Sequence, residues 1–240
     1  MCRPVKIAPS VTKCAALKAR IGRRYQIVTQ PIVLGVRSYS FTRIADPNRV
    51  LDEVAAEEDR LEKINGRRTD GVYLHLPYWA ELWDSAYGIG QLLLDRFNTP
   101  GLNVLDLGCG MGFTGMVAAS LGHRVMCADL EPDALLFAQL NALPHGDGIR
   151  ARQLDWRRDR LDERFDLILG ADILYERRQW EFLEPFWREH LMPGGHVLLG
   201  EPGRKTGDDF PGWIAPLGWN IAHHQYPAAN GRTIRIFDVW

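Results

Sequence analysis

The sequence predicts an α/β protein whose central sheet has seven strands, most of them parallel, with helices on both faces of the sheet. Two patterns lead to this prediction. Between residues 103 and 202, short apolar runs alternate with longer amphipathic segments, which is the sequence form of parallel strands joined by helices. After residue 218, two further runs separated by a turn-rich segment predict a closing antiparallel pair.

Composition places the chain among folded proteins of ordinary surface charge. Hydrophobic residues make up 46% and charged residues 25% of the 240 residues, which excludes a disordered or low-complexity protein. No apolar run approaches the roughly 20 residues that span a bilayer, so a membrane-embedded protein is excluded as well. The 29 basic residues balance the 30 acidic ones, and this balance gives no electrostatic signal for nucleic-acid binding.

The chain divides into three segments. Residues 1–24 hold seven basic and no acidic side chains, which predicts a flexible basic extension; an organelle-targeting segment is the alternative. Residues 25–75 are an N-terminal elaboration, and residues 76–240 form the main domain. The four cysteines show no paired spacing and favour a reducing cytoplasm, while the seven histidines show no spacing suited to a metal. We therefore expect a cytoplasmic protein without a metal site.

The N-terminal elaboration combines a β-hairpin with a helix. Apolar and polar residues alternate over residues 25–44, with candidate breaks at Pro31 and Arg37. Pro47, preceded by an aspartate that can cap a helix, then opens a segment in which apolar residues recur at helical spacing until Gly66.

The main domain begins with a helix that we expect to start after Pro77. The five strands that follow are predicted at residues 103–108, 123–130, 148–155, 165–172 and 195–202, and the closing pair at residues 219–226 and 233–240. Helices are predicted at residues 112–120, 132–142, 178–190 and 208–217.

A glycine-rich loop joins the first of these strands to a helix. Gly108, Gly110, Gly112 and Gly115 follow the strand, and glycine permits both a tight turn and a close approach of the backbone to a ligand. This order of strand, loop and helix is that of a Rossmann-like cofactor site; glycines used only for packing are the alternative. The spacing alone does not choose between a dinucleotide and another adenosyl cofactor.

Asp106 distinguishes between these cofactors. It lies two residues before Gly108, at the carboxyl end of the strand, where the negative field of a pyrophosphate would disfavour a carboxylate. S-adenosylmethionine carries an ammonium and a sulfonium and no phosphate, so an acid near its methionine half gains a charge-assisted contact. The sequence therefore predicts S-adenosylmethionine as the cofactor and S-adenosylhomocysteine as its product.

Two further acids fit the same cofactor. Asp129 ends the second strand, where it can accept hydrogen bonds from both ribose hydroxyls; a helix cap before Pro132 is the alternative. Asp155 ends the third strand and offers an acceptor for the adenine amino group beside the ring of Trp156; a loop role is the alternative.

Together these residues resemble the class I, or seven-β-strand, S-adenosylmethionine-dependent methyltransferases over roughly residues 76–202. The D-x-G-x-G-x-G core that begins at Asp106 is similar to that of the whole class. The segments LPYWAELWDSAYGIGQLL and GADILYE resemble the non-SET protein lysine methyltransferases, the group that includes the enzyme acting on the electron-transfer flavoprotein β subunit. This resemblance implies a protein partner that presents a lysine side chain.

The same resemblance implies roles for single residues. Asp172 and Tyr175 match the D-x-x-Y signature whose side chains line the acceptor channel, and Trp83 or Trp79 matches a tryptophan that packs near the cofactor. Asp172 also follows an apolar strand at its carboxyl end, where open α/β sheets bind ligands. A helix cap with its packing partner, and core packing of the two tryptophans, are the structural alternatives. The predicted cofactor-binding residues are Trp83, Asp106, Gly108, Cys109, Gly110, Gly112, Asp129, Leu130, Asp155, Trp156 and Ala171.

Other functions remain open. A small-molecule N- or O-methyltransferase would use the same cofactor. A nicotinamide-dependent oxidoreductase would share the glycine loop but is opposed by Asp106, and a non-catalytic binding module is opposed by Asp172 and Tyr175. An enzyme that methylates RNA or DNA amino groups would be expected to carry N-P-P-[YF] after the fourth strand, whereas this chain has ADILY at residues 171–175.

Overall fold

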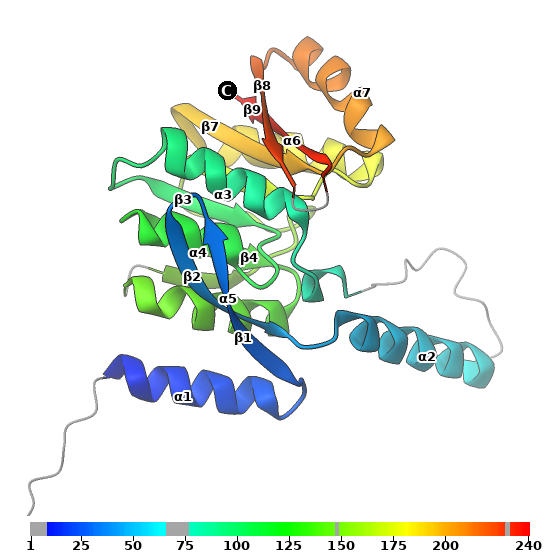
Figure 1. Cartoon of the computed structure of the whole chain (residues 1–240). Coiled ribbons are helices and arrows are strands. Elements are labelled where there is room, and N and C mark those ends of the chain that lie inside the picture. The colour runs from blue at the N-terminus through cyan, green and yellow to red at the C-terminus, as the bar shows by residue number, and fades with distance from the viewer. Residues whose placement is uncertain (1–8, 66–76, 147–148, 229–230) are drawn as a thin grey trace, which may run out of the picture.

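A computed structural model of the chain describes residues 9–65, 77–146, 149–228 and 231–240. Its centre is a seven-stranded sheet in the order β5-β4-β3-β6-β7-β9-β8, in which only the pairs that involve β9 are antiparallel (Figure 1). The predicted sheet and its closing antiparallel pair are thus confirmed. The strands are β3 (Asn103–Leu107), β4 (Arg124–Asp129), β5 (Ile149–Gln153), β6 (Phe165–Ala171), β7 (Leu191–Glu201), β8 (Ile221–Pro227) and β9 (Thr233–Val239).

Helices cover both faces of this sheet, as predicted. Side chains that alternate along a strand enter the two cores in turn, so Val104 packs under α3, α4 and α5, and Leu105 packs under α6 and α7. In the part of the chain that the structure describes, no helix has the length and apolar character needed to cross a membrane. The helices and short 3-10 turns are α3 (Asp84–Arg96), α4 (Phe113–Ser120), α5 (Pro132–Ala142), η2 (Leu143–His145), α6 (Arg177–His190), α7 (Lys205–Ile214) and η3 (Ala215–Leu217).

The helix expected directly after Pro77 begins later. A single 3-10 turn, η1 (Tyr78–Ala80), comes first, and the backbone is extended at Trp83, with φ −73° and ψ 144°. Asp84 then lies in the first turn of α3, where a carboxylate interacts favourably with the helix dipole. Trp79 and Trp83 are therefore not neighbours on one α-helix, because the α-helix includes neither of them.

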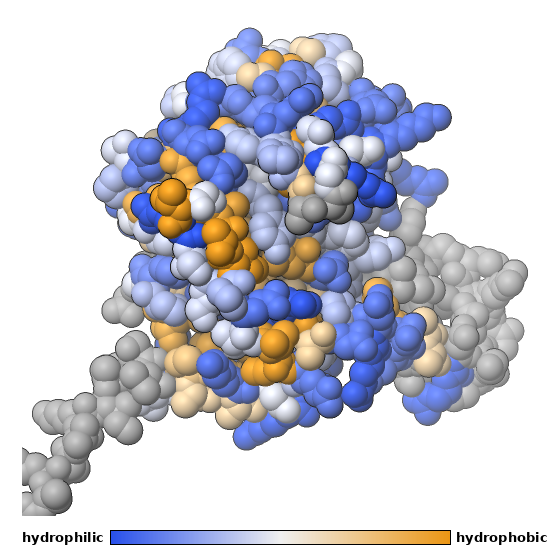
Figure 2. Space-filling view, viewed as in Figure 1, coloured by the Kyte–Doolittle hydropathy of each residue, from blue (hydrophilic) through white to orange (hydrophobic). Residues whose placement is uncertain are grey.

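The N-terminal elaboration is, as predicted, an antiparallel hairpin followed by a helix: β1 (Ile27–Leu34), β2 (Arg37–Ile44) and α2 (Pro47–Asn65). The strands turn at Gly35 and Val36, so the candidate break at Pro31 lies within β1, whereas the one at Arg37 lies directly after the turn, at the first residue of β2. Pro31 is tolerated because β1 has β2 as its one neighbour in the sheet. Val33 and Val36 are exposed at this turn, and Figure 2 shows hydrophobic surface over the hairpin among mostly hydrophilic surroundings.

Residues 9–22 of the segment expected to be a flexible extension form a helix instead, α1 (Pro9–Gly22). Leu17 and Ile21 are buried one helical turn apart, and α1 packs against α5. Arg24 makes an ion pair with Asp133 in the first turn of α5. The sequence does not predict this helix because its two buried side chains, placed among three basic residues and several small ones, do not form an obvious apolar face.

Asn141 of α5 connects the hairpin to the glycine loop. Its Oδ1 accepts a hydrogen bond from the backbone N–H of Thr42 at 2.8 Å, and its Nδ2 donates to the carbonyl oxygens of Thr42 and Met111, both at 2.9 Å. A buried amide whose hydrogen bonds are satisfied makes its surroundings rigid. The hairpin therefore supports the loop from the side of α5.

Candidate functional site

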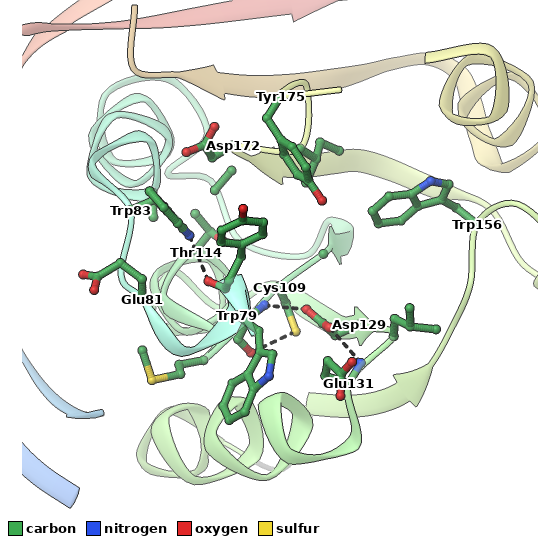
Figure 3. Close-up of a pocket in the computed structure, with 18 of the residues that line it drawn as sticks. Trp79, Glu81, Trp83, Cys109, Thr114, Asp129, Glu131, Trp156, Asp172 and Tyr175 are labelled. Atoms are coloured by element: carbon green, nitrogen blue, oxygen red, sulfur yellow. Dashed lines mark hydrogen bonds between the residues drawn. The ribbon is translucent and has the colours of Figure 1, made fainter. Parts of the chain in front are cut away.

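A pocket opens at the carboxyl ends of β3, β4 and β6, where β4 and β6 lie on opposite sides of β3. This is the place at which open α/β sheets bind ligands. Figure 3 looks into the pocket: Asp129 lies on one side, Asp172 and Tyr175 lie on the opposite side, and Trp83 and Trp156 stand at its two ends.

The glycine loop forms the floor of the pocket next to β3. Gly110 and Gly112 have positive φ angles of 51° and 79°. A Cβ atom at Gly112 would lie 2.6 Å from the Cα of Ala138 on α5, and one at Gly110 would lie 3.2 Å from the carbonyl oxygen of Trp79. Both positions therefore require glycine, for backbone conformation and for close packing. Gly110 lies on the pocket wall, whereas Gly112 lies behind it.

Asp106 lies beneath the loop rather than on the pocket wall. It is fully buried, and its carboxylate accepts hydrogen bonds from Thr114 Oγ1 and from the backbone N–H of Gly115, both at 2.7 Å. Burial raises the pKa of Asp106 to about 6, although these two hydrogen bonds oppose the rise. The direct contact with a ligand expected for Asp106 is not available in this arrangement. Its carboxylate instead fixes the first turn of α4 against β3.

Asp129 ends β4 and holds the loop from the other side. Its Oδ2 accepts a hydrogen bond from the Gly110 backbone N–H at 2.8 Å, and its Oδ1 accepts one from the Glu131 N–H at 2.9 Å. Burial raises the pKa of Asp129 to about 6, against the effect of these hydrogen bonds. The side chain lines the pocket and lies close to the backbone of the glycine loop.

Asp155 and Trp156 lie on the pocket wall after β5, but the Asp155 carboxylate already has a partner. It accepts hydrogen bonds from Arg157 Nε and Nη2, both at 2.8 Å, and these hold the pKa of Asp155 below its ordinary value. The indole Nε1 of Trp156 donates to Gln179 Oε1 at 3.1 Å, which fixes the orientation of the ring. Trp156 therefore offers an ordered aromatic wall, while much of the Asp155 carboxylate is used by Arg157.

Asp172 directly follows β6 and has a φ of 59°, the one positive φ among the non-glycine residues that the structure describes. Its backbone N–H donates to the Gly200 carbonyl oxygen at 2.9 Å, and its Oδ1 accepts a hydrogen bond from Arg204. Its Oδ2 is buried and, within the described residues, has no hydrogen-bond partner. Burial raises the pKa of Asp172, and the Arg204 guanidinium opposes this rise.

Three aromatic rings line the same side of the pocket. Tyr78 meets Tyr175 edge to face, with ring centroids 5.9 Å apart, and meets Trp83 at 6.2 Å. The Trp83 Nε1 donates to the Tyr78 carbonyl oxygen at 3.0 Å, so the indole ring is held against the backbone of η1. Glu81 and Glu176 also lie on the wall. Aromatic faces beside carboxylates attract cations.

Most of the residues that the sequence predicted for the site come together in this pocket. Asp106 and Gly112 lie outside its wall and support the loop from behind. Sequence reasoning missed Tyr78 and Arg204, which depend on the break before α3 and on the loop after β7. In the described ranges, no group of three His, Cys, Asp or Glu side chains is arranged to hold a metal. The predicted residues on the wall are Trp83, Gly108, Cys109, Gly110, Asp129, Leu130, Asp155, Trp156, Ala171, Asp172 and Tyr175.

Comparison with protein families gives one match, over residues 75–209, to a family described as lysine methyltransferase. Among curated proteins, the chain is 36% identical over 130 residues to the protein N-lysine methyltransferase METTL21A of Danio rerio, which covers 50% of this chain. It is 32% identical over 162 residues to the electron transfer flavoprotein beta subunit lysine methyltransferase of Rattus norvegicus, which covers 64% of this chain. The chain spans 58% of the length of each of these relatives.

Solved structures share the fold. The N-methyltransferase NodS from Bradyrhizobium japonicum WM9, in complex with S-adenosyl-l-homocysteine, aligns with a TM-score of 0.55 at 18% identity, over 79% of this chain and 97% of that one. The ribosomal protein L11 methylase from Lactobacillus delbrueckii subsp. bulgaricus aligns with a TM-score of 0.53 at 24% identity, over 62% of this chain and 75% of that one.

Proposed function

The chain belongs to the lysine methyltransferase family, and from this membership we propose that it transfers a methyl group from S-adenosylmethionine to the side-chain amine of a protein lysine. The observation that carries the proposal is the carboxylate of Asp172. It lies on the pocket wall with one buried oxygen that has no hydrogen-bond partner in the described part of the chain. A buried polar atom of this kind costs free energy until a donor reaches it, and an amine or ammonium is such a donor.

The residues on the opposite side of the pocket fit an adenosyl group. An ionised carboxylate has about four lone-pair sites, and Asp129 uses two of them for the N–H groups of Gly110 and Glu131. The remaining sites are available to two ribose hydroxyls. The glycine at position 110 leaves the backbone open to close approach, and Asp106 holds the loop in place from below. The ordered ring of Trp156 would serve as a wall for the adenine.

S-adenosylmethionine supplies a methyl group that its sulfonium has already activated for displacement. The neutral amine nitrogen forms the new N–C bond as the C–S bond breaks, and S-adenosylhomocysteine leaves. The protein's part is to align the amine with the methyl group and to exclude water. Asp172 would orient the amine through its free oxygen, and the rings of Tyr175 and Tyr78 would line the path of the lysine side chain.

A protein acceptor is supported by the relatives, whose names describe lysine methylation of proteins. We infer a protein that presents an accessible lysine as the partner. We also propose the cytoplasm as the compartment, since Cys14, Cys109 and Cys127 are all free thiols and a reducing environment keeps thiols in that state.

The test is a labelling experiment in a lysate of the source cells. The purified protein is incubated with S-adenosylmethionine that is radiolabelled on its methyl group, and protein and small-molecule fractions are then separated and counted. We expect label in protein that amino-acid analysis recovers as methyllysine, and an initial rate of labelling lower by on the order of 10²-fold with the Asp172→Asn variant. Label confined to small molecules would replace the protein acceptor with a small-molecule one. The absence of enzyme-dependent label in both fractions would contradict the proposed activity.

A further inference from the structure

Arg204 lies behind the pocket wall and connects two of its residues. Its guanidinium donates a hydrogen bond to Asp172 Oδ1 at the end of β6, and it lies 5.5 Å from the ring centroid of Trp83, which precedes α3. Arg204 itself precedes α7, in the loop after β7. One side chain therefore joins three segments that are far apart in the sequence, at the side of the pocket opposite Asp129.

The backbone of Arg204 is fixed by a buried ion pair. Glu201, at the end of β7, is 2% exposed and accepts hydrogen bonds from the backbone N–H groups of Gly203 and Arg204. Arg235 of β9 donates to Glu201 Oε2 from Nε at 2.8 Å and to the Arg204 carbonyl oxygen from Nη2 at 3.0 Å. The guanidinium of Arg204 thus extends toward Asp172 from a rigid base.

We propose that Arg204 is a positioning residue that engages one oxygen of Asp172 and leaves the other oxygen free for the acceptor amine. This proposal rests on the proposed methyl transfer. The two oxygens of Asp172 have different surroundings. Oδ1 accepts a hydrogen bond from Arg204, and Oδ2 is buried without a hydrogen-bond partner among the described residues. The φ of 59° at Asp172 is a left-handed backbone conformation, which aspartate adopts more readily than most non-glycine residues, and it directs the side chain from the end of β6 toward Arg204.

The charge of Arg204 has a second effect on the acceptor. An unpaired buried carboxylate would bind a lysine ammonium strongly and keep its proton in place. A carboxylate already paired with a guanidinium attracts the ammonium less, so the neutral amine that methyl transfer needs forms more readily. Arg204 therefore lets Asp172 orient the amine without holding it in the protonated form.

Two charged groups act on the Asp172 carboxylate, Arg204 and Glu201. Burial raises the pKa of Asp172 and the nearby Glu201 carboxylate adds to the rise, whereas Arg204 lowers the pKa. Tyr175 is itself affected, since the Asp172 charge helps to raise the pKa of its phenol, after burial and other neighbours. Without Arg204, the remaining influences all favour the protonated acid, which can no longer accept a hydrogen bond at both oxygens.

The test compares Arg204→Gln with Arg188→Gln. Arg188 is a matched control because it too pairs with a largely buried carboxylate, Glu184, and lies over a tryptophan ring, that of Trp219 at 4.8 Å, yet neither Glu184 nor Trp219 is on the pocket wall. The titration of Asp172 is followed in the free protein by NMR of ¹³C-labelled aspartate carboxyls, with the signal assigned from Asp172→Asn. The pH profile of kcat/KM is measured in parallel with the acceptor protein that the labelling experiment identifies.

In Arg204→Gln we expect the midpoint of the Asp172 titration to move to a higher pH by about one unit or more, since loss of an adjacent opposite charge has an effect of that size. The acid limb of the kcat/KM profile should move by the same amount. Arg188→Gln should leave both midpoints unchanged. Arg204→Lys, which keeps the positive charge, should return both midpoints most of the way to their wild-type values. An unchanged midpoint in folded Arg204→Gln would overturn the proposal. A uniform loss of kcat/KM at every pH would also overturn it, because that is the signature of a purely structural role. Should the wild type methylate no substrate, the proposed function fails, while the NMR titration still decides whether Arg204 controls Asp172.

Discussion

The Asp129 carboxylate accepts a 2.8 Å hydrogen bond from the backbone N–H of Gly110 and so connects the end of β4 to the glycine loop that follows β3. Asp129→Ala removes this connection together with the charged acceptor proposed for the ribose hydroxyls. We expect S-adenosylmethionine and S-adenosylhomocysteine to bind more weakly by ~1.5–3 kcal/mol, measured by calorimetry. Asp133→Ala, which changes an acid in the first turn of α5 away from the pocket wall, is the control. Equal affinities for Asp129→Ala and the wild type would remove Asp129 from the site.

The buried Asp129 also predicts how stability depends on pH. Burial raises the pKa of Asp129 from an ordinary value of 3.8 to about 6. Its contribution to folding is therefore fully present below the unfolded-state pKa and is lost as the pH rises through the folded-state value. The free energy of unfolding of Asp129→Asn, relative to the wild type, should increase by on the order of 1–3 kcal/mol between pH 4 and pH 7.5. Urea unfolding without cofactor measures the difference; a difference that is constant with pH would contradict the prediction.

Substitution of Gly110 tests the close approach at the loop. Valine at this position would adopt an unfavourable positive φ and would place its Cβ about as close to the Trp79 carbonyl as contacts allow. The strain is worth roughly 1–3 kcal/mol, and the branched side chain would enter the space proposed for the cofactor. We expect binding to fall below detection in calorimetry while circular dichroism still reports a folded chain. Wild-type affinity in Gly110→Val would make the loop structural only.

Asp172→Asn separates catalysis from cofactor binding. Asparagine is one of the non-glycine residues that best tolerates a positive φ, so the turn after β6 should keep its shape. We expect cofactor affinity to stay nearly constant and turnover to fall by on the order of 10²-fold, because a misplaced acceptor reacts slowly. Tyr175→Phe should show a smaller loss, since it removes the hydroxyl and keeps the ring. Turnover at the wild-type rate in folded Asp172→Asn would show that the D-x-x-Y acid has no catalytic part.

The buried face of α1 predicts that this helix contributes to stability. Ile21 is 1% exposed, and its replacement by alanine should lower the free energy of unfolding by ~2–4 kcal/mol. Val36→Ala, at the exposed hairpin turn, should change it by less than about 0.5 kcal/mol. Urea unfolding of both variants distinguishes a helix that belongs to the fold from an appended segment, for which Ile21→Ala would be as neutral as Val36→Ala.

The main sheet could be predicted from the sequence because its strands are short apolar runs with turn signals between them, and periodicity reports burial directly. Helix α1 could not, since its burial involves two residues and depends on the surface of α5, which lies more than 100 residues later. The start of α3 differs from the prediction because a 3-10 turn at residues 78–80 and an extended backbone at Trp83 come between Pro77 and the α-helix, and neither interrupts the apolar pattern of the sequence.

The site likewise contains residues that the sequence predicts and residues that it does not. Motif spacing predicted that Asp129, Asp172 and Tyr175 lie together, and they line one pocket because the carboxyl ends of parallel strands share one edge. Asp106 lies at the predicted end of β3, but its side chain points away from the pocket. Along β3 it shares the face of Val104, which α4 covers, so alternation alone directs its carboxylate toward the helix. Arg204 carried no such signal, since its contact with Asp172 depends on the path of the loop after β7.

The position of β9 between β7 and β8 affects the order in which the chain can fold during synthesis. Strand β7 is complete at residue 201, yet its antiparallel neighbour is not made until residues 233–239 have followed. Throughout that interval a nascent chain on the ribosome exposes an unpaired apolar edge, which is a template for association with other chains. The Glu201 carboxylate also lacks its ion-pair partner, Arg235, during the same interval. A chain released in this stretch would therefore have its glycine loop but also an unpaired strand edge that favours aggregation.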